Sequence, residues 1–265
     1  MQTQRVAIAC RLLTAILSLL LAACSQNSGS DTAAPRELLV YCGITMIKPM
    51  SEIAARIEAQ ENCQITITKG GSGNLLKAIQ VNQVGDLYLP GADSYIKTAQ
   101  AEGLVSEAVF VGHNKAALMV QRGNPKSIPA DLTSLTDPGY YVVIGNPESG
   151  SIGRETRRIL DRRGIFAQVS ANARRLTTDS KDLVRLLRDK EADLVINWHA
   201  TATWPENTAA VTALPIDSRY ATPRRLVIGL LNTTRYPEIA RKFMALAAAP
   251  EGREIFRKYG LFHGE

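Results

Sequence analysis

The chain has 265 residues and a modest basic excess, with 31 Lys and Arg against 25 Asp and Glu and a formal net charge of +6. It contains neither a run of five basic residues nor a basic stripe interleaved with aromatic side chains, so its composition excludes the footprint of a nucleic-acid-binding protein. Its length suffices for one large domain or two of ordinary size, with a full hydrophobic core in either case.

The first 23 residues have the layout of an export signal. Arg5 and Arg11 precede an uncharged apolar run, residues 12–21, and small residues follow it. The alternative is a membrane-spanning helix, which needs about 20 apolar residues, and this run is shorter. The run leads into Ala22-Ala23-Cys24, which is similar to the lipobox of bacterial lipoproteins and implies a lipid on Cys24. Without Arg5 and Arg11 the remaining chain has a net charge of +4.

Residues 24–36 are expected to be a flexible tether. Between Ser25 and Pro35 the side chains are small and mostly polar, so this stretch buries too little apolar surface to offset the entropy of ordering it. Beyond Arg36 no apolar stretch is long enough to cross a membrane.

Strand-like and helix-like segments alternate in the first part of the remaining chain. Apolar runs predict strands at 38–41, 65–67 and 86–89, and apolar residues at helical spacing predict helices at 47–57 and 75–79. Asp93 is placed to cap a further helix. This alternation predicts an α/β fold whose parallel sheet is covered on both faces.

A second alternating series begins near Ala116. Strands are predicted at 116–120, 141–144, 194–196 and 226–231, and helices at 152–163, 183–187 and 236–246. Pro250 suits the first turn of one more helix.

Cys42 and Cys63 are the two cysteines in the predicted folded region. Cys42 ends the first strand and Cys63 precedes the second, so in a parallel pair they lie at opposite ends of the sheet. The distance exceeds the roughly 7 Å between Cα atoms that a disulfide tolerates, so two free thiols are expected.

Four loops follow predicted strands and should open toward one crevice, where parallel sheets bind ligands. They are residues 42–45, 70–74, 145–153 and 197–198. Each of the first three combines glycine with a hydroxyl residue and leads into a helix, whose amino terminus offers N–H groups to an anion. The alternative is that Thr45 and Ser72 are ordinary helix caps and the glycines ordinary turns.

Motifs for catalysis or metal binding are missing. No two of His113, His199 and His263 stand at metal-ligand spacing, and Gly70-Gly71-Ser72-Gly73-Asn74 departs from the nucleophile elbow at its last position. The sequence has no phosphate loop and no dinucleotide fingerprint. Asp86, Asp93 and Glu148 are better explained by structural roles. We therefore expect no enzyme, no metal and no cofactor.

Five segments, taken together, resemble the molybdate-binding periplasmic proteins of ABC transporters, which have the type II periplasmic binding protein fold. The resemblance runs in order from Leu38 to Phe262, and its most telling motifs are the apolar strand that opens with Asp86 and is followed by GADSY, and the closing EIFRKYGL. The segments are LLVYCGITMIKPMSEIAARIE, ITITKGGSGNLLKAI, VGDLYLPGADSYIKTAQAEGLV, VIGNPESGSIGRETRRIL and EGREIFRKYGLF.

The resemblance implies two doubly wound α/β lobes with mainly parallel sheets, joined by crossover strands, and a ligand cleft between them. Residues 37–116 and 217–265 would form the first lobe and residues 117–216 the second. In the family, hydroxyls and backbone N–H groups hold the oxyanion without a counter-charge. The matching positions are the hydroxyls of Thr45 and Ser72, the amides of Ile152 and Ser180, and Trp198, which stands where the family has a tyrosine.

The implied function is an extracytoplasmic, lipid-anchored, monomeric solute-binding protein that delivers molybdate or tungstate to an ABC permease. Thr45 adds a methyl group to the expected serine, and the indole of Trp198 can donate but not accept a hydrogen bond. These departures leave sulfate, phosphate or a phosphonate-like acid open as ligands. Two other functions also stay open, a ligand sensor without transport and a hydrolase or transferase on the same scaffold.

Overall fold

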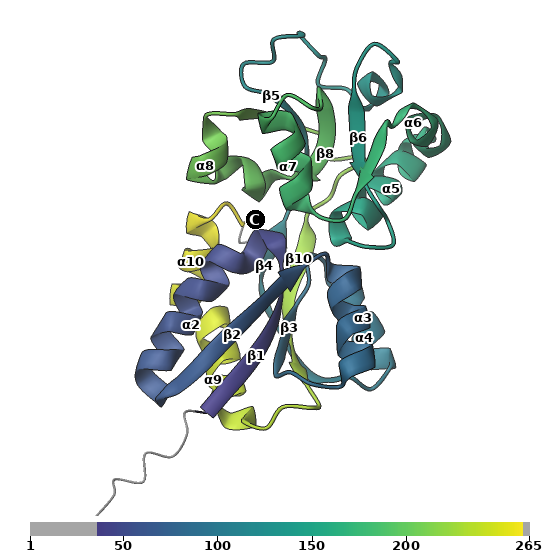
Figure 1. Cartoon of the computed structure of the whole chain (residues 1–265). Helices are drawn as coiled ribbons and strands as arrows, with labels where there is room; N and C mark the ends of the chain where they lie inside the picture. The colour runs from purple at the N-terminus through teal and green to yellow at the C-terminus, as the bar shows by residue number, and fades with distance from the viewer. Residues whose placement is uncertain (1–35, 262–265) are drawn as a thin grey trace, which may run out of the picture. The chain divides into compact units, whose positions relative to one another are not determined.

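The computed structural model describes residues 36–261. The predictions of a signal peptide at 1–23, of a tether and of a lipid on Cys24 fall outside these residues, as does His263. The described chain contains two five-stranded sheets, each with helices on both faces (Figure 1). We call each sheet with its helices a lobe.

The sheet of the first lobe has the strand order β2-β1-β3-β10-β4. Side chains of β1 alternate between its two faces, because Leu38 and Val40 pack in one apolar cluster with α2, α9 and α10, whereas Tyr41 packs in another with α3 and α4. The elements of this lobe are β1 (Arg36–Gly43), η1 (Ile44–Met46), α2 (Ile47–Glu61), β2 (Cys63–Gly70), α3 (Ser72–Asn82), β3 (Leu87–Leu89), α4 (Ser94–Ala101), β4 (Val105–Asn114), β10 (Arg224–Leu231), α9 (Pro237–Ala248) and α10 (Pro250–Lys258).

The sheet of the second lobe has the order β7-β6-β8-β5-β9 and one apolar core cluster. The chain passes between the lobes twice, first where only Lys115 separates β4 from β5, and again along residues 215–223. The elements are β5 (Ala116–Gln121), η2 (Leu132–Thr136), β6 (Val142–Gly145), α5 (Ser151–Arg163), α6 (Phe166–Asn172), β7 (Arg175–Thr177), α7 (Ser180–Arg188), β8 (Leu194–Trp198), η3 (His199–Thr203), α8 (Pro205–Thr208) and β9 (Val211–Leu214).

The predicted α/β class is confirmed, and the strand pairing adds that both sheets are mixed. In the first lobe β10 runs antiparallel to β3 and β4, and in the second β5 runs antiparallel to β8 and β9. The sequence patterns missed β4, β7 and β9. β7 is a three-residue edge strand whose Leu176 is 52% exposed, so it lacks the buried apolar run used to find the others.

Several local predictions can be checked directly. Cys42 and Cys63 are free thiols, and β1 and β2 pair in parallel with Cys63 opposite Arg36, as expected. The helix predicted after Asp93 is present as α4 with Asp93 at its N-cap position, but the Asp93 side chain makes no capping hydrogen bond and pairs with Lys97 instead, at 3.0 Å. Among the described residues no helix has the length and apolar character needed to cross a bilayer.

Candidate functional site

A small cavity lies where the predicted loops of the two lobes meet. Thr45 and Ser72 line it from the first lobe, and Ile152, Ser180 and Trp198 line it from the second. The structure thus brings all five predicted residues together. The cavity measures about 10 Å³, close to the roughly 10–15 Å³ that one water molecule needs, so a larger ligand requires its walls to move slightly.

Three helices begin at this cavity. The first residues of α3, α5 and α7 are Ser72, Ser151 and Ser180, and each of them lines the cavity. The first amides of a helix have no carbonyl partner within it and carry the positive end of the helix dipole. The cavity therefore receives N–H donors and partial positive charge from both lobes.

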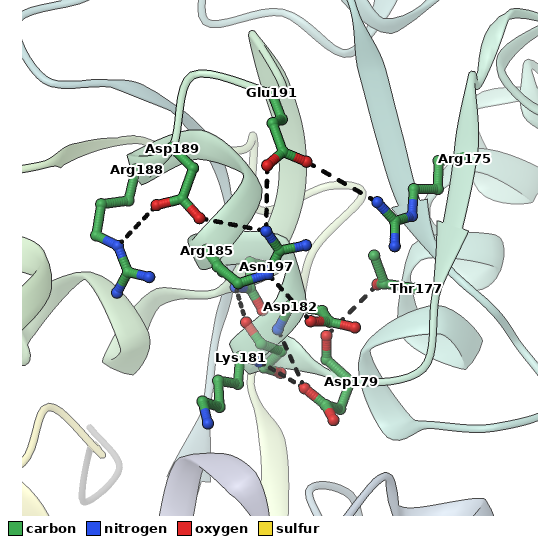
Figure 2. Close-up of polar contacts among 11 residues, drawn as sticks. Arg175, Thr177, Asp179, Lys181, Asp182, Arg185, Arg188, Asp189, Glu191 and Asn197 are labelled. Atoms are coloured by element: carbon green, nitrogen blue, oxygen red, sulfur yellow. Dashed lines mark hydrogen bonds and ion pairs between the residues drawn. The ribbon is translucent and has the colours of Figure 1, made fainter.

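Polar contacts fix the start of α7, as Figure 2 shows. The Asp179 carboxylate accepts hydrogen bonds from the amides of Lys181 (2.8 Å) and Asp182 (3.2 Å). The side-chain amide of Asn197, at the end of β8, donates to the carbonyl of Ser180 (2.9 Å). Asp179 thus caps the helix, and Ser180 is held in place by the neighbouring strand.

Four hydroxyl residues line the cavity, and three of them, Thr45, Ser72 and Ser151, each accept a hydrogen bond from a fixed donor. Thr45 accepts from the side-chain amide of Asn114 (3.1 Å), Ser72 from the amide of Gly91 (3.0 Å), and Ser151 from the indole of Trp198 (3.2 Å). The Thr45 hydroxyl donates to the sulfur of Met46, with 2.7 Å between Oγ1 and Sδ, and a thioether is a weak acceptor. Because these three oxygens already accept a bond, their hydroxyl hydrogens are what they can offer to an anion, that of Thr45 in exchange for its weak bond to Met46.

A hydrogen bond from Tyr88 also fixes the backbone at Ser72. Tyr88 is fully buried on β3, and its hydroxyl donates to the carbonyl of Ser72 (2.7 Å). Burial raises the pKa of Tyr88 well above its usual range, so the phenol keeps the proton with which it donates. The position of Ser72 thus depends on the central strand of the first lobe.

The alternative of ordinary helix caps is wrong for Thr45 and Ser72. Thr45 lies within η1, and the residue that caps α3 is Gly71, which makes no side-chain capping bond. Trp198 stands at the predicted place, buried, but its N–H points to Ser151. Sequence reasoning did not select Ser151 or Asp179, although both begin or cap a helix that follows a strand.

The two lobes touch directly beside the cavity. The amide of Asn74 in the first lobe donates to the carbonyl oxygen of Ser149 in the second (3.2 Å). A Cβ atom on Gly71 would lie 2.5 Å from that same oxygen, so only glycine permits this approach. Gly91 likewise packs against Ser151, whose Oγ would be 2.2 Å from an added Cβ. The structure is therefore a closed arrangement of the two lobes.

The charges lining this cavity are few. Within residues 36–261 no lysine or arginine lines it, and Asp179 is the one acidic side chain that does. That part of the chain also contains no group of three His, Cys, Asp or Glu residues able to hold a metal ion. The cavity thus offers neutral donors in excess of acceptors.

A family model described as "Bacterial extracellular solute-binding protein" matches residues 38–262. The chain belongs to this family. As a solute-binding protein, it has a binding function rather than a catalytic one. Among its relatives, the molybdate-binding protein ModA of Mycobacterium tuberculosis is 26% identical over 261 residues, which cover 94% of this chain and 95% of that protein.

Solved structures of other binding proteins share the fold. The periplasmic molybdate-binding protein of Azotobacter vinelandii superimposes with a TM-score of 0.72 at 15% identity, over 86% of this chain and 100% of that one. The sulfate-binding protein SubI of M. tuberculosis gives a TM-score of 0.72 at 14% identity, over 85% and 86%. At these identities the structures establish the two-lobed architecture.

Proposed function

We propose that this solute-binding protein captures a tetrahedral oxyanion, molybdate or tungstate, and presents it to an ABC permease. The observation that carries the proposal is the convergence on one cavity of three helix starts and of three hydroxyls whose oxygens already accept a hydrogen bond. A fully ionised oxyanion accepts hydrogen bonds at every oxygen and donates none. A wall of donors matches that chemistry, and each charge-assisted bond contributes about 1.5–3 kcal/mol.

Two further observations favour a small ion over a larger solute. The cavity is of molecular-water size, and the hydrogen of Thr45 faces a weak sulfur acceptor that an anion would outcompete. The name of the ModA relative points to molybdate, and that of SubI points to sulfate. Sulfate is therefore the second candidate ligand.

Ligand capture would couple to closure of the lobes. Because donors come from both lobes, an anion between them gains its full set of bonds only when Gly71 approaches Ser149. The closed form would then be the one that the permease recognises. In this proposal residues 1–23 are a signal peptide, residues 24–36 form the tether, and a lipid on Cys24 anchors the monomer outside the cytoplasmic membrane.

Calorimetric titration of the purified protein with molybdate, tungstate, sulfate and phosphate tests the ligand assignment. We expect molybdate and tungstate to bind most tightly, one ion per chain, and Ser72→Ala to weaken both by about tenfold or more. Phosphate carries a proton at neutral pH and needs an acceptor, and Asp179 is the one carboxylate among the described lining residues. Tighter binding of phosphate than of the other ions would contradict a site built from hydrogen-bond donors. Absence of binding for all four ions would refute the oxyanion assignment.

The anchoring proposal has its own test. Metabolic labelling with a radioactive fatty acid should mark the wild-type protein in its bacterial host, and Cys24→Ser should abolish the label. The variant Cys63→Ser is the matched control, because it removes a thiol from the folded part of the chain and leaves Cys24 in place. Labelling that survives Cys24→Ser would contradict a lipid on this residue.

A further inference from the structure

A second, larger cavity adjoins the first. It measures about 200 Å³, and Ser151 lines both. Its other polar walls are Arg154, Glu155 and Arg158 of α5, Arg224 at the start of β10, and the beginning of α4. We call it the arginine cavity. It lies between the lobes, because α5 belongs to the second and both α4 and β10 belong to the first.

Positive charge exceeds negative charge in the arginine cavity. Glu155 is 4% exposed and pairs with Arg158 on its own helix and with Arg224 across the lobes, the latter at 2.6 Å. Asp93, the other carboxylate on the wall, is bound to Lys97. The wall thus carries three guanidinium groups and two carboxylates, and the buried carboxylate of Glu155 pairs with two of those guanidinium groups.

Several guanidinium nitrogens have no acceptor among the described residues. The Nη1 atom of Arg158 is buried without a hydrogen-bond partner. Within residues 36–261, Arg224 bonds only through its Nε atom, and Arg154 forms no ion pair but lies over the ring of Tyr95, 3.9 Å from its centroid. A buried donor without an acceptor is costly, so the Nη1 atom of Arg158 favours an added acceptor in this cavity, whereas Arg154 is exposed and Arg224 partly exposed.

We propose that the arginine cavity is a second anion site, which takes a carboxylate, sulfate or phosphoryl group. Guanidinium forks bind such groups through paired hydrogen bonds. The group can come from a separate ion or from a second acidic group on a ligand whose oxyanion occupies the first cavity. In either case it bridges Arg224 of one lobe and Arg154 of the other, and so favours closure.

The test uses Arg154→Gln, which removes an exposed guanidinium that no carboxylate needs. Arg157→Gln is the matched control, because Arg157 lies one turn on along the same helix, pairs with Asp161 and is absent from the cavity wall. The protein is first saturated with molybdate, and sulfate is then titrated in a calorimeter at low ionic strength. We expect wild type and Arg157→Gln to bind one further sulfate, and Arg154→Gln to bind it about tenfold more weakly.

Phosphonoacetate, which carries both a phosphoryl and a carboxylate group, distinguishes the two sources. If one ligand supplies both groups, phosphonoacetate binds the molybdate-free protein more tightly than phosphate, and Arg154→Gln removes the gain. If the anions are separate, phosphonoacetate shows no gain and sulfate still enters the molybdate-loaded protein. The second site is overturned if neither effect occurs, or if Arg154→Gln and Arg157→Gln behave alike.

The test of the second anion site can fail or succeed independently of the proposed function. Ser72→Ala alters the first cavity alone, so loss of molybdate binding in that variant with Arg154-dependent sulfate binding intact separates the two sites. A wild type that ignores molybdate yet binds sulfate through Arg154 would refute the proposed function and support the second site.

Discussion

The two cavities on either side of Ser151 meet negative charge in opposite ways. The first measures about 10 Å³ and is walled by helix amides and hydroxyls, with no cationic side chain among its described lining residues. The second measures about 200 Å³ and is walled by three guanidinium groups around one buried carboxylate. The same helix, α5, supplies its amino terminus to the first and its next turn to the second.

The difference separates two ways of recognising an anion. Fixed dipoles select by shape, because each donor must reach a particular oxygen and salt hardly screens a buried contact. Guanidinium groups select by charge and tolerate several shapes, but they also attract ordinary solution anions. We therefore expect the first cavity to set which ligand binds and the second to modulate how firmly the lobes close.

The largest effect on molybdate affinity is expected from Gly71→Val, which would hold the lobes apart and so prevent the first cavity from closing. A side chain at this position meets the backbone oxygen of Ser149, so donors from the second lobe cannot reach the ligand. Losing two or more such bonds should weaken molybdate binding by at least about a hundredfold in calorimetry, with unfolding temperature nearly unchanged.

Gly70→Ala is the matched control for Gly71→Val. Its added Cβ would meet only the Leu75 side chain, at 3.4 Å and beyond, so the lobes can still close, and although Gly70 lines the cavity the loss of binding should be far smaller than in Gly71→Val. Full affinity in Gly71→Val would mean that the ligand binds to one lobe and that closure contributes nothing.

A second prediction concerns the charge of the arginine cavity. Burial raises the pKa of Glu155 from 4.5 to about 7, against the opposing effect of Arg224. Because the pKa of Glu155 is higher in the folded protein than in the unfolded chain, protonated Glu155 stabilises the folded protein. This contribution is complete below pH 4.5 and is lost as the pH rises through about 7. The free energy of unfolding should therefore fall by about 2 kcal/mol from this group between pH 5 and pH 7.

The measurement compares urea unfolding of wild type and Glu155→Gln across this pH range. Glutamine does not titrate, so the difference between the two proteins should follow the protonation of Glu155. A difference that stays constant with pH would show that the two guanidinium groups keep Glu155 ionised throughout.

The two cavities also differ in how far the sequence predicted them. Thr45, Ser72, Ile152 and Trp198 lie in loops that follow predicted strands, and the resemblance to the molybdate-binding family, rather than a local pattern, selected them together with Ser180. The contacts that complete the walls are not local: Trp198 meets Ser151 across 47 residues, and Arg224 meets Glu155 across 69. No spacing pattern in the sequence encodes such pairs, so the arginine cavity could not be predicted without the three-dimensional arrangement of the lobes.

A third prediction separates Ser151 from Trp198 in the first cavity. Ser151→Ala removes a hydroxyl donor and should weaken molybdate binding by about tenfold. Trp198→Phe removes only the indole that orients this hydroxyl, so we expect a loss of about threefold or less. Calorimetric titration of both variants with molybdate measures the two losses of affinity, and thermal unfolding checks that both variants fold. A loss in Trp198→Phe as large as that in Ser151→Ala would mean that the indole itself donates to the ligand.

The smallest effect is expected at a surface contact between the lobes. Lys48 of α2 and Glu206 of α8 form an ion pair at 2.8 Å, with side chains 30% and 51% exposed. Exposed pairs contribute about 0–1 kcal/mol, so Glu206→Gln should change molybdate affinity by less than about fivefold. The change should be smaller still in about 0.5 M salt, because salt at that concentration shortens the Debye length well below 10 Å and screens the pair. Closure would then depend on the buried donors around Ser72 and Ser151 rather than on the surface pair. A loss approaching that of Gly71→Val would reverse this order and make the surface charges the main determinant of the closed state.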